Sequence, residues 1–151
     1  MKVDVQYKGK VLKKLIEQVE LAKSKAVYVG IPAEANKPVE DGEKFNLASL
    51  AAVLEFGNKR IPSRPFLRQT LEKNKHKYSR FFTDFLKESL DVNQAYGKIA
   101  LLVQADVQLE IVNGEWVANA KSTIKRKKSS KPLINTGRLR QSIVGVVRDE
   151  K

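Results

Sequence analysis

The longest helical pattern in the sequence begins directly after two closely spaced prolines, and this arrangement constrains the rest of the fold. Between Leu67 and Phe85, apolar and aromatic side chains and one asparagine recur at alternating steps of four and three residues. Only a helix brings such positions to one side. Pro62 and Pro65 fix their own φ and push the preceding residue towards extended geometry. We therefore expect a stiff turn before a long helix, with Pro65 in its first turn and Ser63 or Arg64 as its cap.

Three further segments have helical patterns. The first restarts at Val92 and continues to about Val112, and two long helices with a short join usually form an antiparallel hairpin. Residues 11–22 carry one apolar stripe, which predicts a surface helix packed on a core. Residues 47–56 predict a helix with Asn46 at its N-cap. Gly57-Asn58 follows where such a helix should end in a left-handed residue with positive φ.

Short segments rich in β-branched residues predict a small sheet. They lie at residues 26–31, ended by Pro32, and at residues 143–147, with Trp116-Val117 as a further candidate strand. Together the elements predict the α+β class. We expect a helix-rich single domain over residues 1–151, with a long helical hairpin packed on a small, mostly antiparallel sheet of three or more strands.

An acidic segment, residues 33–45, is expected to be a flexible loop. It contains Pro38 and the pair Asp41-Gly42, which favour turns. Its acidic cluster of Glu40, Asp41 and Glu43 is a weak candidate for a cation site.

A basic segment, residues 120–132, is also expected to be a flexible loop. Its cations include the consecutive run Lys125, Arg126, Lys127 and Lys128. This run can contact phosphate by salt-dependent neutralisation, but it lacks the interleaved aromatic residues that stack on bases. A solvated loop, and a loop that becomes ordered when a partner protein binds, are the alternatives that the sequence leaves open.

Composition gives little support to an enzyme. The chain has no cysteine, and its single histidine, His76, lies among lysines on the polar side of the long helix. We therefore expect His76 to be exposed, and we predict no metal site and no cofactor. No phosphate loop, dinucleotide fingerprint or serine elbow is visible.

The net charge is +12, from 29 Lys and Arg against 17 Asp and Glu. Such an excess favours polyanions and acidic surfaces in general, and it also serves simply as solubilising charge. No apolar run approaches the roughly 20 residues that cross a bilayer. We expect a soluble protein with no membrane partner, and the absence of cysteine is consistent with an intracellular setting.

The turn around the two prolines is a candidate interface. It displays Arg60, Arg64 and Arg68, with Phe56 and Phe66 on either side. Arginine is favoured in bidentate recognition of carboxylates and is enriched at interfaces, and a stiff turn loses little entropy on docking. Phe66 continues the helical stripe and is expected in the core, and a solvated rim is the alternative for the arginines.

Two blocks of sequence together resemble a known family. Residues 54–68 contain E-F-G followed by I-P-x-R-P-F-L, and residues 133–143 contain T-G-x-L-x-x-S-I. In this order and in a chain of this length, the blocks resemble tailed-bacteriophage virion-morphogenesis proteins, most closely the Mu-like tail-completion group, with the head–tail joining neck proteins related to it.

The resemblance implies a structural role in phage assembly. Such proteins complete the tail or join it to the head, often as rings, and they are not enzymes and need no cofactor. It therefore implies a ring homo-oligomer, with a hexamer as one candidate, and tail-tube and head–tail connector proteins as partners. It also implies a place in the virion, at the tail or the head–tail junction, after a stage in the host cytoplasm.

The family motifs also suggest roles for single residues. Gly57 and Gly137 would supply turn geometry, and Phe66 and Leu139 would belong to the core. Arg64 and Arg138 would form polar pairs or contact a neighbouring subunit. The other positions carried over are Glu55, Phe56, Pro62, Pro65, Thr136 and Ser142.

The resulting hypothesis is a structural phage or prophage protein that completes the tail or joins tail to head, as a ring. Its interface candidates are Phe56, Arg60, Arg64, Arg68, Arg138 and Arg140, and its architectural candidates are Gly57, Pro62, Pro65, Phe66, Thr136 and Gly137. The alternative is a stand-alone basic nucleic-acid-binding module that makes non-specific DNA contacts through Lys125, Arg126, Lys127 and Lys128.

Overall fold

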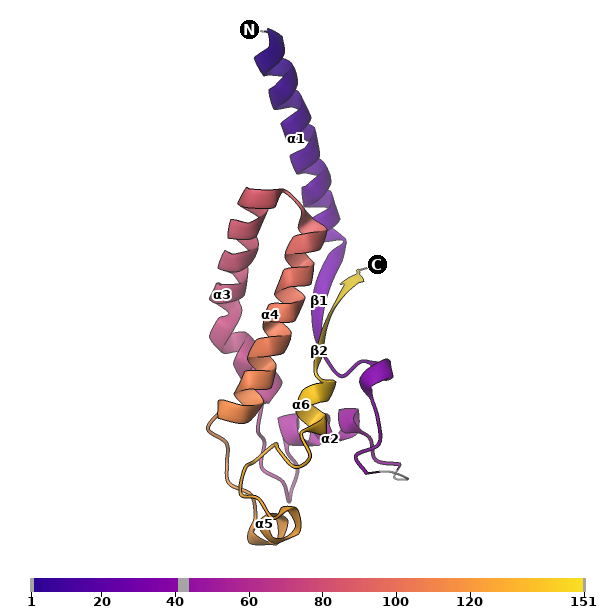
Figure 1. The fold of residues 1–151 in the computed structure, drawn as a ribbon, viewed down its shortest axis with the longest axis vertical. Helices are drawn as coiled ribbons and strands as arrows, with labels where there is room; N and C mark the ends of the chain where they lie inside the picture. Colours follow the sequence, from indigo (N-terminus) through magenta and orange to yellow (C-terminus); the bar gives the residue numbers. More distant parts are fainter. Residues whose placement is uncertain (1, 41–43, 151) are drawn as a thin grey trace.

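The computed structural model describes residues 2–40 and 44–150, with the side chains of residues 2–8 left out. The elements occur in the order α1 (Lys2–Lys23), β1 (Lys25–Gly30), η1 (Ala33–Ala35), α2 (Leu47–Phe56), α3 (Phe66–Ser89), α4 (Val92–Asn113), α5 (Lys121–Lys127), α6 (Arg138–Ser142) and β2 (Val144–Asp149). The predicted class is confirmed: a long helical pair, α3 and α4, packs with a small antiparallel sheet in a helix-rich α+β fold (Figure 1).

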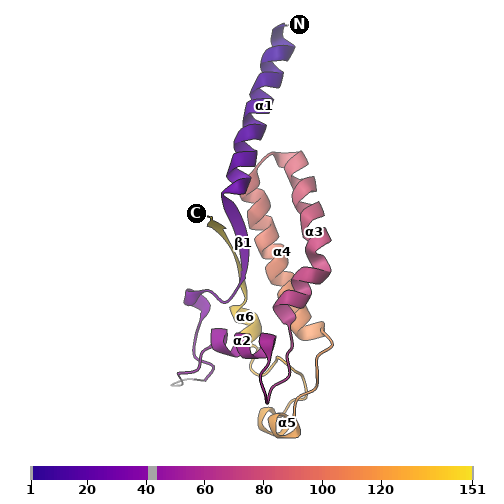
Figure 2. The ribbon, with the colours of Figure 1, turned by 180° about the vertical axis from the view of Figure 1, so that it is seen from behind.

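Helix α4 is the centre of the molecule. Its buried side chains follow helical spacing from Val92 to Ile111, with α3 on one side and the β1–β2 sheet on another (Figures 1 and 2). Asp91 caps its N-terminus through a 3.0 Å hydrogen bond from the Gln94 amide. The predicted hairpin is therefore present, and its second helix supplies most of the core.

The sheet has two antiparallel strands among the described residues, fewer than the three or more that we predicted. The register runs from Lys25 opposite Asp149 to Gly30 opposite Val144. Gly145 faces α4 so closely that a β-carbon there would collide with the carbonyl of Ala100. Glycine at this place in β2 thus lets the sheet lie directly on the central helix.

The prediction of a strand at Trp116-Val117 is wrong. These residues lie in an irregular segment after α4, where the indole Nε1 donates to the carbonyl of Glu110 at 3.2 Å. The Trp116 ring packs against the hydrophobic core. The half-buried Trp116 side chain thus anchors a loop to the core and does not extend the sheet.

Helix α5 lies inside the basic segment that was expected to be a loop. The segment 120–132 contains the helix Lys121–Lys127, which ends at Lys128 with a positive φ of 53°. In the described residues of the acidic segment, 33–40 and 44–45, the structure contains the short η1, and Pro38 forms an isolated bridge with Asn46 just after the segment. Asp41 and Glu43, and with them most of the acidic cluster, lie outside the described residues.

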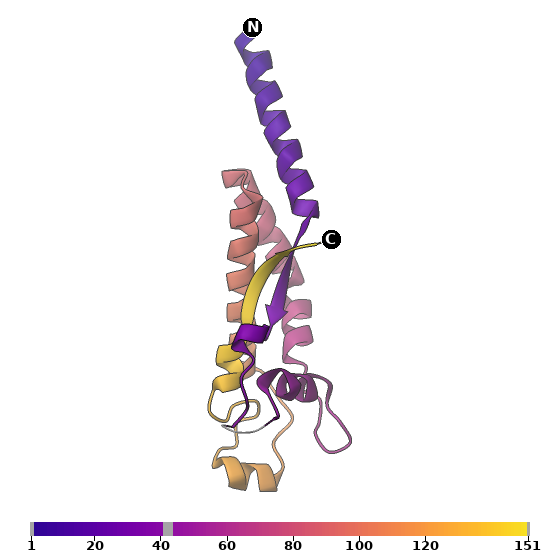
Figure 3. The same cartoon turned by 90° about the vertical axis from the view of Figure 1, so that its right-hand side faces the viewer.

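Helix α1 departs from the prediction in its packing. It covers the expected residues 11–22 but begins earlier, and it extends past the tip of the α3–α4 hairpin (Figures 1 and 3). Its apolar stripe was expected to pack on the core, yet Leu12 is 57% exposed and Ile16 is 55% exposed. The hairpin borders the stripe only at its C-terminal part, where Leu15 and Val19 line a groove with Phe82 and Leu86.

Candidate assembly interface

The segment 57–65, here called the elbow, joins α2 to α3 through a tightly closed turn. Gly57 ends α2 with φ 73° and ψ 178°, so the predicted positive φ is present although ψ lies outside the left-handed helical region. A β-carbon at Gly57 would lie 2.6 Å from the amide nitrogen of Ser63. Asn58 then closes the turn, because its Oδ1 accepts from the amides of Arg60 and Ile61 at 2.8 and 2.9 Å. Only glycine fits the first position.

Glu55 caps α3 from a distance. The residue preceding that helix is Pro65, which makes no side-chain cap, so the predicted capping by Ser63 or Arg64 is wrong. Instead the Glu55 carboxylate accepts from the amide of Leu67 at 2.9 Å through Oε2 and from the amide of Arg68 at 3.0 Å through Oε1. Glu55 is only 3% exposed. A carboxylate at the N-terminus of a helix accepts hydrogen bonds from the free amides, and its negative charge interacts favourably with the positive end of the helix dipole.

Arg68 and Phe56 form the outer layer over this buried carboxylate. The Arg68 Nε donates to Glu55 Oε1 at 3.0 Å, and its Nη2 donates to the Glu55 carbonyl at 3.2 Å. The same guanidinium lies 5.0 Å from the centre of the Phe56 ring. Phe56 is 66% exposed, so an aromatic ring and a cation lie together on the surface. Aromatic residues and arginine are both enriched at protein–protein interfaces.

The predicted place of Arg64 at the interface is wrong. We expected its guanidinium to face a partner, but the residue is 4% exposed. Its Nε donates to the carbonyl of Val117 at 2.8 Å, and its Nη2 donates to the carbonyl of Ala118 at 3.2 Å and to Asn119 Oδ1 at 3.3 Å. Removal from water lowers the pKa of Arg64 below its usual value. Arg64 therefore holds the segment after α4 against the elbow.

The two sequence blocks meet in one core. Phe66, from the first block, is fully buried and belongs to the same hydrophobic cluster as Leu139 and Ile143 from the second. The predicted core placement of Phe66 is therefore confirmed. Gly137, with φ 82°, occupies the N-cap of α6, and Thr136 accepts from the amide of Arg138 at 3.4 Å.

A shallow apolar groove adjoins Phe56. It has a volume of about 280 Å³ and lies between α2, the start of α3 and the end of β1. Its walls include Ala48, Ala52 and Leu67. With Phe56 and Arg68 at its rim, the groove extends the exposed apolar surface at the elbow.

The other predicted interface residues are scattered over the surface. Arg60 is exposed on the elbow, as is the architectural candidate Pro62, and Arg140 is exposed on α6. Arg138 is exposed as well, and its Nη1 donates to the carbonyl of Val39 at 3.2 Å. Phe56, Arg60 and Arg68 are therefore exposed at or next to the elbow, whereas Arg64 is buried.

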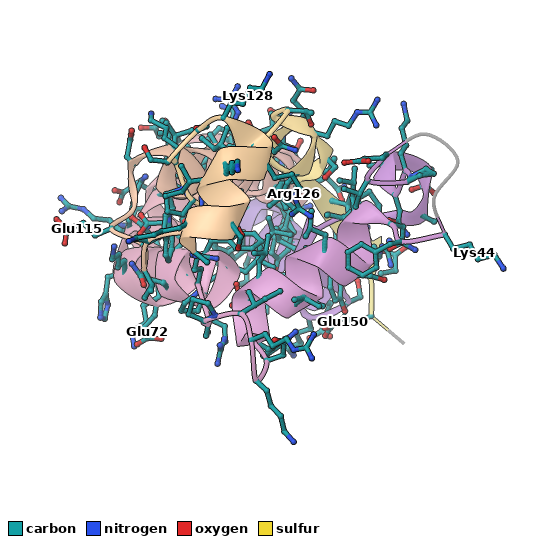
Figure 4. All side chains as sticks on the ribbon, turned by 90° about the horizontal axis from the view of Figure 1, so that it is seen from below. Lys44, Glu72, Glu115, Arg126, Lys128 and Glu150 are labelled. Carbon is teal, nitrogen blue, oxygen red and sulfur yellow. The ribbon has the colours of Figure 1, made fainter. Side chains whose placement is uncertain are left out.

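The basic run lies on α5, at the end of the molecule opposite α1 (Figures 1 and 3). Lys125, Arg126 and Lys128 are exposed, and in the view from that end α5 lies at the front with Lys128 near its edge (Figure 4). Lys127 is half-buried and donates to the carbonyl of Lys131 at 2.9 Å. Burial lowers the pKa of Lys127, and the nearby positive charges of Arg64 and Arg126 lower it further. Three cations rather than four remain for phosphate at the surface.

His76 is exposed, as predicted. No group of three His, Cys, Asp or Glu side chains that could hold a metal ion occurs within residues 2–40 and 44–150. In the same residues, no helix combines the length and the apolar character needed to cross a membrane.

The sequence did not predict the role of Glu55, although the residue stood within the first block. A carboxylate at the end of one helix, just before a proline-started second helix, is the signal that could have revealed it.

No protein-family model matches this chain, and comparisons with curated proteins and with solved structures also give no match.

Proposed function

We propose that the protein is a structural component of a tailed-phage or prophage particle that completes the tail or joins tail to head, as a ring of identical subunits. The observation that carries the proposal is the surface of Phe56 and Arg68 above the buried Glu55. An exposed aromatic ring beside an arginine and an apolar groove is typical of residues that dominate protein–protein binding.

The sequence blocks support the same proposal. Both blocks belong to one structural unit, because Phe66, Leu139 and Ile143 share a core. The resemblance to tail-completion proteins therefore concerns a unit that folds together rather than two unrelated motifs. Assembly through a heterologous contact that closes would give a ring.

The test is ring formation by the purified chain. We expect a closed oligomer by light scattering and negative-stain microscopy at high protein concentration, and its loss in Phe56→Ser and in Arg60→Ala. Phe81→Ser and Arg80→Ala are matched controls, because both residues are exposed on α3 away from the elbow. Ring formation that survives Phe56→Ser, or no ring at any concentration, would contradict the proposal.

The second candidate function is non-specific nucleic-acid binding. It is favoured by the exposed cations Lys125, Arg126 and Lys128 at one end of the molecule. Its test is a salt titration of duplex DNA binding, in which each phosphate contact contributes about −0.9 to the slope of log K against log salt. Binding at near-physiological salt that Lys125→Glu and Lys128→Glu abolish would favour this function over assembly.

A further inference from the structure

Arg64 is a buried cation whose hydrogen-bond partners in the described structure are all neutral oxygen atoms. It is 4% exposed, and its guanidinium donates to the carbonyls of Val117 and Ala118 and to Oδ1 of Asn119. Among the described residues, no carboxylate forms an ion pair with it. Because proteins normally pair the charges that they bury, the missing counter-charge points to an anion from outside the chain.

One nitrogen of the Arg64 guanidinium remains free to meet such an anion. Nε and Nη2 make the three hydrogen bonds to the segment after α4, whereas Nη1 donates to no acceptor in the described part of the chain. Within the same residues, the Tyr78 hydroxyl is the one fully enclosed side-chain polar atom that lacks a partner. Nη1 is therefore not sealed in the interior, and a small ligand can reach it.

Lys127 brings a second cation to the same place. The side chain of Asn119, which accepts from Arg64, donates through Nδ2 to the carbonyl of Lys131 at 3.2 Å, and Lys127 Nζ donates to that carbonyl at 2.9 Å. The charge of Arg64 lowers the pKa of Lys127 more than the charge of the adjacent Arg126 does. Lys127 also forms no ion pair with a described carboxylate. Two neighbouring cations thus lack an anion.

The charge and the donors of this pair fit a phosphate group. A lysine ammonium has three donors, so Lys127 keeps two beyond its bond to the Lys131 carbonyl. A phosphate monoester carries a charge of about −1.5 to −2 at pH 7 and three strong acceptor oxygens, which matches two cations, whereas a carboxylate carries a single charge. Because Arg64 is buried and Lys127 half-buried, a small or terminal phosphate reaches both more easily than a phosphate inside a duplex strand.

We propose that Arg64 and Lys127 form a recessed site between the elbow and α5 for a phosphate dianion, either free inorganic phosphate or the terminal phosphate of a nucleic-acid strand. Arg64 Nη1 and Lys127 Nζ donate to the phosphate oxygens, while Nε and Nη2 of Arg64 keep their bonds to the segment after α4. The site lies at the α5 end of the molecule (Figure 4). It is separate from the surface around Phe56 and does not rest on the proposed function.

Calorimetric titration of the full chain with inorganic phosphate, at constant ionic strength, tests the site. We expect one saturable site per chain, and Lys127→Gln should weaken the binding by roughly tenfold or more. Lys125→Gln is the matched control, because Lys125 is exposed on the same helix; it should change the affinity by less than about twofold. No saturable binding, equal losses in the two variants, or acetate that binds as tightly as phosphate would overturn the proposal.

NMR titration of the Lys127 side chain gives a readout that a merely structural role would not change. Burial and two neighbouring positive charges lower the pKa of Lys127 in the free protein. Saturating phosphate should raise that pKa, because an adjacent anion favours the charged ammonium. A Lys127 pKa that stays the same while phosphate binds would place the phosphate elsewhere and contradict the assignment.

Oligonucleotides distinguish the two sources of phosphate. If strand ends are the source, a duplex with 5′-phosphates should bind roughly tenfold more tightly than the same duplex with 5′-hydroxyls, and Lys127→Gln should remove the difference. Equal binding of the two duplexes, with inorganic phosphate still bound through Lys127, assigns the site to free phosphate. Phe56→Ser should leave phosphate binding unchanged and Lys127→Gln should leave the ring intact, so that failure of the ring and failure of this site are told apart.

Discussion

Glu55, at the end of α2 beside the elbow, is 3% exposed, and both of its carboxylate oxygens accept hydrogen bonds from backbone amides of α3. On α1, by contrast, Leu12 is 57% exposed. The two regions lie at opposite ends of the molecule (Figure 1). Polar groups at the elbow serve the fold, and apolar groups on α1 remain available to a partner. Residue type alone would suggest the reverse, with charged groups outside and leucines inside.

The largest effect is expected for Glu55→Ala. The substitution leaves the N-terminal amides of α3 without their acceptor and Arg68 without its carboxylate, so we expect a loss of about 3 kcal/mol in the free energy of unfolding. Urea denaturation measures it, with the exposed Glu34→Ala as control. A change below about 0.5 kcal/mol would mean that the carboxylate does not cap the helix.

Gly57→Ala should be the next most damaging change. Its positive φ and the 2.6 Å approach of the Ser63 amide leave no room for a β-carbon, and we expect a loss of about 2 kcal/mol. The matched control is Gly97→Ala on α4, where nothing lies within 4 Å of the added atom; this change should stabilise the protein by about 0.5 kcal/mol. Equal effects in thermal denaturation would contradict the account of the elbow.

The smallest effect on stability is expected on α1. Leu12→Ser removes an exposed side chain, so the free energy of unfolding should change by less than about 0.5 kcal/mol. The control is Leu139→Ala, a buried position, which should cost about 3 kcal/mol. A large loss of stability from Leu12→Ser in the monomer would show that α1 packs on the core after all.

Periodicity predicted the helices well, because each long helix has a strong local pattern. The α3–α4 hairpin, α2 and its Asn46 cap all follow from spacing and capping signals. The Asn46 side chain accepts from the Ser49 amide at 2.9 Å. Local patterns sufficed for these elements because their hydrogen bonds lie within a few residues of each other.

Contacts between distant residues could not be predicted in the same way. The burial of Arg64 depends on a contact with Val117, which lies 53 residues further along the chain. Local sequence around Arg64 does not reveal that contact. The stripe on α1 has the spacing of a core helix, yet its burial depends on the length of the hairpin beside it. Local sequence gives the amphipathic face of a helix but not what covers that face.

The most direct test compares Arg64→Met with Arg60→Met. Both arginines lie on the elbow and were equal candidates by sequence, but Arg64 is buried on three oxygen acceptors and Arg60 is exposed. We predict that Arg64→Met lowers the free energy of unfolding in urea by about 2 kcal/mol, whereas Arg60→Met leaves it within about 0.5 kcal/mol. Equal losses, or a larger loss at Arg60, would contradict the division of the elbow into a structural inside and an interface outside.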